Sequence, residues 1–469
     1  MKTILSFSKK IIALLIFCVA VPAISFAQWI GPINLSPNAV RASLNESMGP
    51  CMGVSGDTVH VIWTDQKMYP YTKINVLYYT RSIDTGASWS VPVAITNING
   101  NAWHPIIAVS GKNVHVAWEE VDTVTNKRNS YYQHSLDGGN TWGGNRFIDS
   151  TSDWPGLAVS GNNVYIVNDR HITASNSEIF FLRSTDNGVT WSAETQLTSA
   201  PLRSEDEGIV AQGSHIHMSW NDNRTGSFQI FYKESSDYGV TWGQDVVVDT
   251  QADYNTMLCS NGPNVDVVAT GAASGFYQLL ISQSADSGVT WLGATGVNLS
   301  NDPSHSYYLP YVVRDGSNIH VVVNSSGGAK YFHSANGGTS WDPAVTLSGA
   351  NFIQYTGCVL HVLYTDNTHK IYYLRNRTGN SGTTCLGSMG TNQLANRANT
   401  LNAYPNPSKN SITVSSENEL GMVTIYNSLG EIIYKEKTNN TLQQIDVSKH
   451  AAGIYFLEAQ NSFIKIIKE

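Results

Sequence analysis

An eight-residue pattern, Ser-x-Asp-x-Gly-x-Thr-Trp, occurs six times in this sequence with small variations. Its third position recurs at spacings of 53, 49, 51, 49 and 50 residues and is occupied by Asp84, Asp137, Asp186, Asp237, Asp286 and Asn336. Self-similarity at a fixed spacing predicts a repeat protein in which each unit is one supersecondary element. This pattern constrains the fold more than any other feature of the chain.

The repeated pattern has the chemistry of a tight turn. An Asp or Asn side chain accepts hydrogen bonds from nearby backbone N–H groups, and a Gly two residues later tolerates a positive φ. The Trp that ends the pattern can lie across the turn, with its indole N–H bonded to a partner. We therefore expect the six Asp and Asn residues to be structural, because equivalent positions spread over six units do not converge on one catalytic or calcium-binding site.

Each repeat also contains runs of alternating apolar residues, such as Val114–Trp118 and Tyr131–His134 before the second turn. These runs predict β-strands. A shorter run follows each turn, for example Val91–Ile95. Each unit therefore predicts a four-stranded antiparallel sheet, the blade of a β-propeller.

The strands indicate one more unit than the turns do. Second and third strands each occur seven times, and the seventh unit, near residues 350–376, lacks an outer strand. Residues 29–36 resemble residues 89–96, which form the outer strand of the first unit, so they can fill this gap. Residues 29–376 give about 50 residues per unit when divided by seven. The sequence predicts an all-β, seven-bladed propeller closed by residues 29–36, with six blades as the alternative.

The six turns resemble the Asp-box, or BNR repeat, of the sialidase-like superfamily of β-propellers. This resemblance covers residues 28–377 and implies the propeller fold, with no particular reaction attached. Sialidases of that superfamily need an arginine cluster, a Tyr nucleophile activated by a Glu, and an Asp acid/base. Their Arg-Ile-Pro motif does not occur here, since Arg41 is followed by Ala-Ser.

The two ends of the chain carry export signals. Residues 1–27 combine early lysines, an apolar run and a final Ser-Phe-Ala, which predicts a signal peptide. No later run approaches membrane-spanning length, so the sequence predicts no membrane span. Residues 378–400 are rich in Gly, Ser, Thr and Asn and predict a linker.

Residues 401–469 predict a small β-sandwich of short strands. Tyr404–Pro407, Gly453–Phe456 and the Lys-containing end at 463–468 are similar to the C-terminal sorting domain of type IX secretion substrates. That resemblance implies a Bacteroidota source and the type IX secretion machinery as a partner. It also implies a secreted or outer-membrane surface location, with removal of the domain on export.

Composition narrows the partners further. Charged residues make up 14% of the chain and the net charge is −8, which disfavours nucleic acid as a partner. The cysteines beyond the signal peptide lack metal-ligand spacing, and nothing indicates a metal or cofactor. These cysteines can either form a disulfide near the end of the propeller or remain as buried free thiols; they are Cys51, Cys259, Cys358 and Cys385.

A ligand site is expected on the face opposite the turns, where outer-to-inner and second-to-third connections meet. The ligand-binding candidates in these connections are Trp103, His104, Trp154, Asp169, Arg170, Asp222 and Arg224. The catalytic candidates for a sialidase-like reaction are Arg41, Arg203, Glu205, Tyr307 and Tyr308. The sequence favours a secreted, non-catalytic module that binds a glycan or an extracellular protein. The alternative is a sialidase-like exo-glycoside hydrolase.

Overall fold

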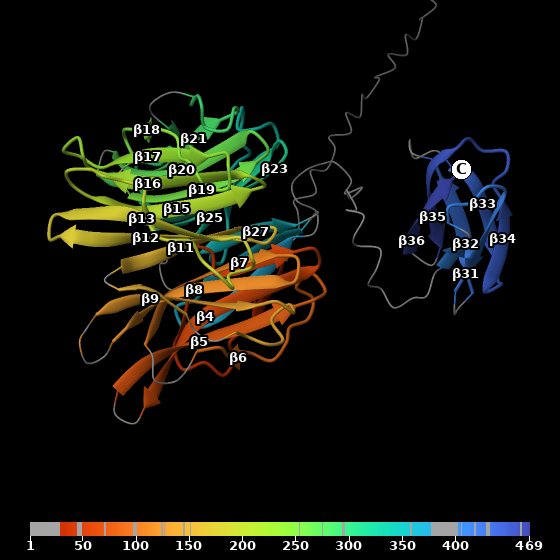
Figure 1. Cartoon of the computed structure of the whole chain (residues 1–469), viewed down its shortest axis with the longest axis horizontal. Coiled ribbons are helices and arrows are strands. Elements are labelled where there is room, and N and C mark those ends of the chain that lie inside the picture. Colours follow the sequence, from red (N-terminus) through yellow and green to blue (C-terminus); the bar gives the residue numbers. More distant parts are fainter. Residues whose placement is uncertain are drawn as a thin grey trace, which may run out of the picture. The chain divides into compact units, whose positions relative to one another are not determined.

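The chain forms two compact units, one up to residue 385 and one from residue 386, and each is described by itself. The computed structural model describes residues 29–44, 49–69, 72–96, 101–122, 125, 127–143, 146–150, 152–252, 254–273, 275–292, 296–356, 359–376, 402–404, 406–416, 419–427, 432–459 and 462–469. The predicted signal peptide, the predicted linker, Cys358 and Cys385 lie outside these residues. Within them, the regular elements are all β-strands (Figure 1).

The first unit contains seven antiparallel sheets, each built from consecutive strands except the last. The first three sheets, from the innermost strand outwards, are β3 (Met52–Ser55), β4 (Thr58–Tyr69), β5 (Thr72–Ser82) and β6 (Val93–Ala94), with β2 (Ala42–Ser43) also on β4; β7 (Ala102–Ser110), β8 (Asn113–Val121), β9 (Arg128–Ser135) and β10 (Arg146–Ser150); and β11 (Ser152–Ser160), β12 (Asn163–Thr173), β13 (Asn176–Ser184) and β14 (Thr195–Gln196).

The remaining four sheets follow the same order, and the last takes its outermost strand from the start of the chain. They are β15 (Ser204–Gln212), β16 (His215–Asp222), β17 (Gln229–Ser235) and β18 (Val246–Asp249); β19 (Tyr254–Asn261), β20 (Asn264–Ala273), β21 (Phe276–Ser284) and β22 (Val297–Asn298); β23 (Tyr307–Asp315), β24 (Asn318–Ser325), β25 (Lys330–Ser334) and β26 (Val345–Thr346); and β27 (Phe352–Thr356), β28 (Val359–Thr365), β29 (Ile371–Asn376) and β1 (Trp29–Asn34).

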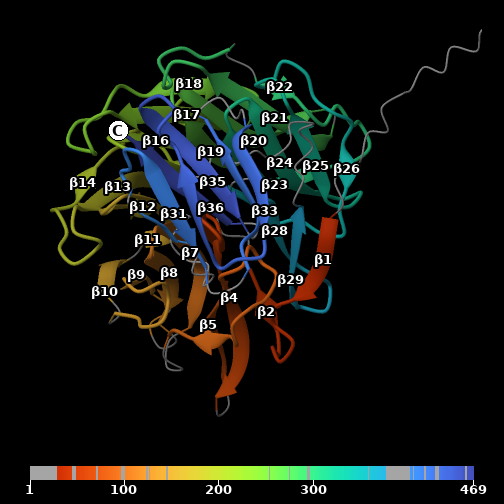
Figure 2. The same cartoon turned by 90° about the vertical axis from the view of Figure 1, so that its right-hand side faces the viewer.

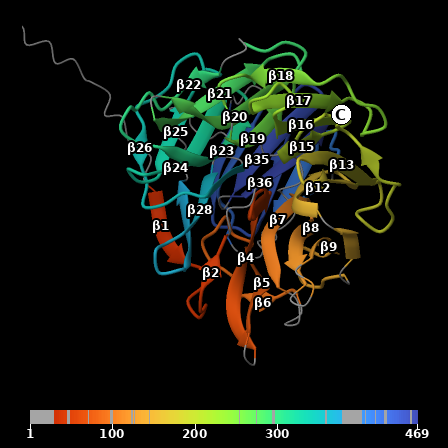
Figure 3. The same ribbon diagram turned by 90° about the vertical axis from the view of Figure 1, so that its left-hand side faces the viewer.

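The sheets are arranged in a closed ring (Figure 2, Figure 3). The innermost strand of each sheet contacts that of the next, in the order β3, β7, β11, β15, β19, β23, β27 and back to β3. β1 pairs antiparallel with β29, in a register that joins Trp29 to Asn376 and Ile33 to Tyr373. This is the pairing that the sequence predicts for residues 29–36. It removes the free sheet edges that an open array would expose.

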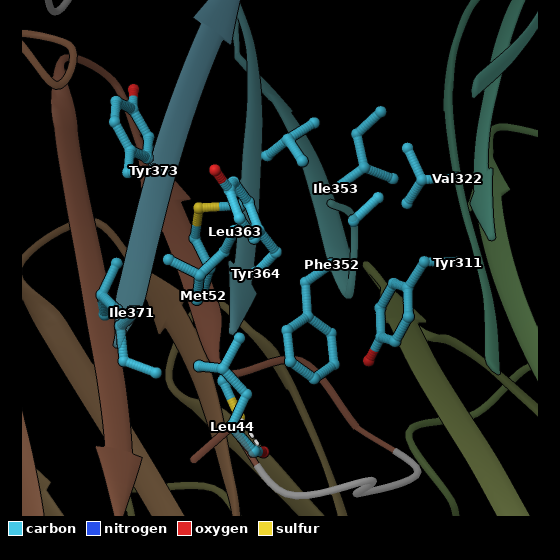
Figure 4. Packing of buried hydrophobic residues seen from close by; sticks show 14 of the residues in the cluster. Leu44, Met52, Tyr311, Val322, Phe352, Ile353, Leu363, Tyr364, Ile371 and Tyr373 are labelled. Carbon is cyan, nitrogen blue, oxygen red and sulfur yellow. Dashed lines mark hydrogen bonds between the residues drawn. The ribbon is translucent and has the colours of Figure 1, made fainter. Parts of the chain in front are cut away.

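The apolar core is continuous where the first and last sheets meet. Leu44 directly follows β2, and Met52 is the first residue of β3. Figure 4 shows both side chains packed among Phe352, Leu363 and Ile371 of the last sheet. All five side chains are buried. Burial of residues at this junction stabilises the closed ring, because each fully buried large apolar side chain contributes about 1.5–3 kcal/mol.

The Asp-box turns have the same internal hydrogen bonds in each sheet that carries one. In the third sheet, the Oδ1 atom of Asp186 accepts from the Ser184 hydroxyl at 2.7 Å and from the Thr190 N–H at 2.8 Å. The Ser184 hydroxyl accepts from the N–H of Gly188, whose φ is +83°. Hydrogen bonds from Thr190 and from Ser184 lower the pKa of Asp186 to about 2. The carboxylate is therefore ionised and bonded within its own turn.

A second repeated contact joins neighbouring sheets. The Trp142 ring of the second Asp-box lies edge-on against Tyr79 of the first sheet, with 4.9 Å between ring centroids. The Tyr79 hydroxyl lies 2.7 Å from His60 Nδ1 and donates to the carbonyl of Gly138. Burial lowers the pKa of His60 to about 3, so this histidine is neutral. Trp29 of β1 makes the equivalent contact with Tyr331, at 5.7 Å, and thus completes the last sheet.

The expectation that each Asp-box Trp bonds its indole N–H is wrong for four of the six turns. Trp191 and Trp291 donate to the carbonyls of Gly188 and Gly288 at 3.0 Å. The other indole N–H groups are buried without a partner, in Trp89, Trp142, Trp242 and Trp341. Trp89, Trp142 and Trp242 pack edge-on against an aromatic ring of the neighbouring sheet, and Trp191 and Trp291 do so as well. Ring packing is therefore the contact that these five turns share, with or without the indole hydrogen bond.

The second unit has two small antiparallel sheets. One contains β30 (Asn402–Tyr404), β31 (Ser411–Ser415) and β34 (Leu442–Asp446); the other has the order β33 (Ile432–Thr438), β32 (Gly421–Tyr426), β35 (Gly453–Ala459) and β36 (Ser462–Lys468). Their facing apolar residues, among them Ile412, Ile425 and Leu457, form a core of their own. This is the small β-sandwich that the strand pattern predicts.

Candidate functional site

Five innermost strands begin with the same irregularity at one end of the ring, which we call the channel mouth. Each strand shifts register against its second strand near its start, by a β-bulge in β7, β11, β15, β19 and β23. One residue within each bulge has a positive φ; these are His104, Trp154, Asp206, Asn255 and Leu309. Non-glycine residues adopt this conformation at a cost of about 1 kcal/mol or more. The repeat therefore holds five chemically different side chains at equivalent points.

The innermost strands enclose a cavity of about 320 Å³. Apolar residues such as Ile107, Leu157 and Val312 line it together with polar ones such as Ser260 and Gln354. Glu207, which directly follows the bulge residue of β15, also lines this cavity and is only 2% exposed. A carboxyl group buried in a cavity wall is the kind of feature that marks functional sites.

A hydrogen-bonded group of aromatic and charged residues connects β7, β8, β9 and β11 at the channel mouth. His104 Nδ1 lies 3.2 Å from a carboxylate oxygen of Glu119, and His104 Nε2 accepts from the indole N–H of Trp154 at 3.1 Å. Arg128 donates to the other oxygen of Glu119 at 3.0 Å. His104, Trp154 and the adjacent Trp103 are all partly exposed. These hydrogen bonds hold the partly exposed aromatic rings in place, and the guanidinium of Arg128 is exposed beside them.

Four carboxyl groups form a second part of the mouth, which we call the acidic sector: Asp169 of β12 and Glu205, Asp206 and Glu207 of β15. Burial, followed by the charge of Glu205, raises the pKa of Asp206 to about 6. Asp206 Oδ2 accepts from the side-chain amide of Asn221 at 2.8 Å. Burial, followed by the charge of Asp169, raises the pKa of Glu207 well above its ordinary value. The Oε1 atom of Glu207 has no hydrogen-bond partner among the described residues.

The structure holds two of the predicted arginines away from this mouth cluster. Arg170 is paired with Asp149 and Glu194 and lies over the ring of Phe180. Arg224 is paired in the same way with Asp222 and Asp245, over Phe231. Asp149 belongs to β10 of the neighbouring sheet, whereas Asp222 ends β16 and Asp245 directly precedes β18 of the fourth sheet. Asp222, also predicted to bind ligand, serves as a partner of Arg224 and of the Trp220 indole.

The other predicted catalytic residues lie at separate points. The backbone N–H of Arg41 bonds to Asp65, and its side chain is exposed. The Tyr307 hydroxyl is buried and bonds to Asp302, and burial raises its pKa to about 12. Tyr308 is 41% exposed, and its ring lies 6.1 Å from that of Tyr277. Arg203 lies 3.7 Å from Glu205. Among the described residues, no contact joins Arg41, Arg203 and Tyr307.

The sequence places Glu119, Asp206 and Glu207 in the connections of the ligand face but does not assign any of them a role in the site. One signal for Glu207 was present in the sequence: β7, β11 and β23 have proline at the equivalent place, as Pro105, Pro155 and Pro310, whereas β19 has Thr256. An acid that replaces a turn-directing proline is a departure from the repeat. The pairing of Glu119 with His104 depends on a bulge that no residue pattern marks.

The described residues contain no group of three or more His, Cys, Asp or Glu side chains placed to hold a metal ion. Nor do they include a helix long and apolar enough to cross a membrane. Cys51 and Cys259 are free thiols, and the sulfur of Cys51 bonds to the carbonyls of Leu44 and Pro105.

The fold and the second unit together define a β-propeller joined to an export domain. Residues 402–469 match the family model of the secretion system C-terminal sorting domain. This match places the chain among proteins exported by the type IX system to the cell surface or the medium.

Solved structures resemble the first unit. An ulvan lyase of a new polysaccharide lyase family, bound to -[GlcA(1-4)Rha3S]-, is similar with a TM-score of 0.51 and 12% identity, over 75% of this chain and 97% of the lyase chain. The NanB sialidase from Streptococcus pneumoniae is similar with a TM-score of 0.44 and 13% identity, over 64% of this chain and 67% of the sialidase chain. A comparison with curated proteins finds no relative of this sequence.

Proposed function

We propose that this protein is an exported, non-catalytic propeller that binds a glycan at the channel mouth. The observation that carries the proposal is the group of His104, Trp154 and Glu119, in which hydrogen bonds hold two partly exposed aromatic rings in place. Aromatic faces cover the apolar side of a sugar ring, and the exposed guanidinium of Arg128 beside them can donate to its hydroxyls. The fold of the ulvan lyase, a protein bound to a glycan in its own structure, supports the same class of ligand.

The contacts of the charged residues favour binding over sialidase-like hydrolysis. Such hydrolysis needs arginines free to clamp a sugar carboxylate. Arg170 and Arg224 are each occupied by two carboxylates. The buried hydroxyl of Tyr307 has a raised pKa, so it is a weak nucleophile near neutral pH.

A glycan array and a fluorogenic sialoside, both applied to the secreted protein, test this proposal. We expect binding on the array and no release of the fluorophore. The Trp154→Ala variant should lose binding, whereas Tyr238→Ala, a change of an exposed aromatic residue in an Asp-box, should keep it. Sialoside turnover that is lost in Arg203→Ala and Tyr308→Phe would establish the hydrolase instead. Capture of an extracellular protein without any glycan would establish a protein ligand.

We also propose that residues from about 401 onward are removed during export. A type IX-competent host should release a form of the protein shortened at its C-terminus. β36 pairs with β35 along its whole length, so deletion of Lys465–Glu469 breaks an outer strand of the domain. We expect this truncated protein to accumulate in the periplasm. Its normal export would contradict the role of the domain as a signal.

A further inference from the structure

The charges that act on the acidic sector are mainly those of other carboxyl groups. Glu205 acts on Asp206, and both Asp169 and Asp206 act on Glu207. Among the described residues, Arg203 is a cation that forms an ion pair with this sector. Its Nη1 atom lies 3.7 Å from Oε2 of Glu205, and its side chain is partly exposed. Within the residues that the structure describes, Asp206 and Glu207 have no ion-pair partner. The sector is therefore a place where added positive charge is favourable and added negative charge is not.

A second observation indicates that the sector is completed by a ligand. Glu207 is almost fully buried, lines the cavity, and leaves its Oε1 atom without a hydrogen-bond partner. Buried carboxyl oxygens are nearly always bonded in folded proteins. The bulge residue next to it, Asp206, is partly exposed, so a ligand can reach the sector through Asp206.

The neighbouring strand supplies an aromatic side chain close to these acids. Asp169 pairs in register with Asp153, which directly precedes Trp154. The innermost strands β11 and β15 contact each other, so Trp154 and Asp206 occupy equivalent bulge positions on adjacent strands. One sugar ring on Trp154 can therefore present a substituent toward the acidic sector.

We propose that the acidic sector binds the ammonium group of an amino sugar, so that the glycan recognised at the channel mouth carries free amines. This inference rests on the proposed function and names the class of its ligand. An ammonium group has three hydrogen-bond donors and matches an acceptor-rich surface of carboxylate oxygens. A glycan with carboxylate groups, by contrast, would bring like charges together at Glu205 and Asp206. The adjacent Trp154 favours a sugar over a lysine side chain as the carrier of the amine.

Calorimetric titration of the secreted protein with three hexasaccharides tests the proposal. The probes are β-1,4-linked glucosamine, the same oligomer fully N-acetylated, and an oligomer of glucuronic acid. We expect the glucosamine oligomer to bind at least tenfold more tightly than the acetylated one, with the acidic oligomer weakest. Asp206→Asn should lower the affinity for the glucosamine oligomer about tenfold and leave that for the acetylated oligomer within twofold. Glu205→Gln should act in the same direction.

The matched control is Asp57→Asn, which changes the same charge in the exposed turn between β3 and β4, beside an Asp-box. It should leave all three affinities unchanged. Equal binding of the free and acetylated oligomers, or a preference for the acidic one, would overturn the amine assignment while glycan binding stands. A hexalysine peptide that binds as tightly as the glucosamine oligomer would overturn the sugar assignment. Binding of no oligosaccharide here or on the array would overturn both proposals.

Discussion

The Asp-box end and the channel mouth are built on the same seven sheets, but they use their side chains differently. At the Asp-box end, equivalent positions carry equivalent residues, and each Asp or Asn bonds to its own turn. At the mouth, the backbone bulge repeats while its side chains change from His104 to Trp154, Asp206, Asn255 and Leu309. Where side chains form the turn, the same residue types recur in each repeat. Where the backbone alone sets the geometry, side chains are free to serve a ligand.

The largest effect is expected from a change at the Asp-box end. Trp142→Ala removes the ring that packs against Tyr79 between the first two sheets. We expect the free energy of unfolding to fall by about 3 kcal/mol, since large-to-small changes leave a cavity. Denaturant unfolding measures this loss, and glycan affinity of the folded protein should not change. Trp142→Phe, which keeps a ring, should lose less. A loss of affinity with unchanged stability would remove the distinction between the two ends.

At the mouth the opposite result is expected from Trp154→Ala. The side chain is partly exposed, and its indole donates to His104. We expect glycan affinity to fall at least tenfold, about 1.4 kcal/mol, because an aromatic anchor is lost. The melting temperature should change much less than in Trp142→Ala. Titration and thermal unfolding of the same samples separate the two effects. Unchanged affinity would place the ligand elsewhere on the propeller.

Asp206→Asn should stabilise the protein as it weakens the site. The pKa of Asp206 is about 6 in the folded protein against an ordinary value of 3.8. As pH rises from about 4 to 6, the unfolded chain ionises this group first, so the native protein loses stability over that window. The Asn variant avoids the loss and should gain about 1–2 kcal/mol at pH 7, with no gain at pH 3. Unfolding at both pH values checks this. A uniform gain at both would point to packing rather than charge.

The smallest effect is expected from Asp186→Asn. The sixth turn already shows that an amide works, since Asn336 accepts from the Ser340 N–H and donates to the Ser340 hydroxyl. We expect little change in melting temperature at pH 7. The lowered pKa of Asp186 stabilises the native state above about pH 4 and less as pH falls toward 2. The variant should lose this acid dependence. A large loss at neutral pH would show that the turn requires a charge.

The parts of the fold that depend on local pattern were predictable. The turns follow from Ser, Asp and Gly spacing, and the likeness of Trp29 to Trp89 predicts the pairing of β1 with β29. The outer strands are shorter than expected, since β6 covers Val93–Ala94 where the pattern suggests Val91–Ile95. The contact of Tyr79 with Trp142 was missed, because it joins residues of different repeats.

The candidate site was predictable only in its general position. Trp103, His104 and Trp154 do lie at the mouth, but at the start of the innermost strands β7 and β11 and not on the connections before them. The partners of Arg170 and Arg224 were not foreseen, since Asp149 and Asp245 come from different parts of the chain. The pKa of Glu207 depends on burial between strands, which no linear pattern records. Cross-strand neighbours therefore decide which polar residues remain available to a ligand.

The origin of β1 has a consequence for how the protein is made. The strand that completes the final sheet is the first of the ring to be synthesised, and its partner β29 is the last. During vectorial synthesis β1 stays unpaired until β29 has emerged, and the Trp29 ring stays without its partner until Tyr331 has been made. A prematurely ended chain keeps an open edge and remains a target for proteases. Complete pairing of the last sheet thus requires that the chain be made as far as β29.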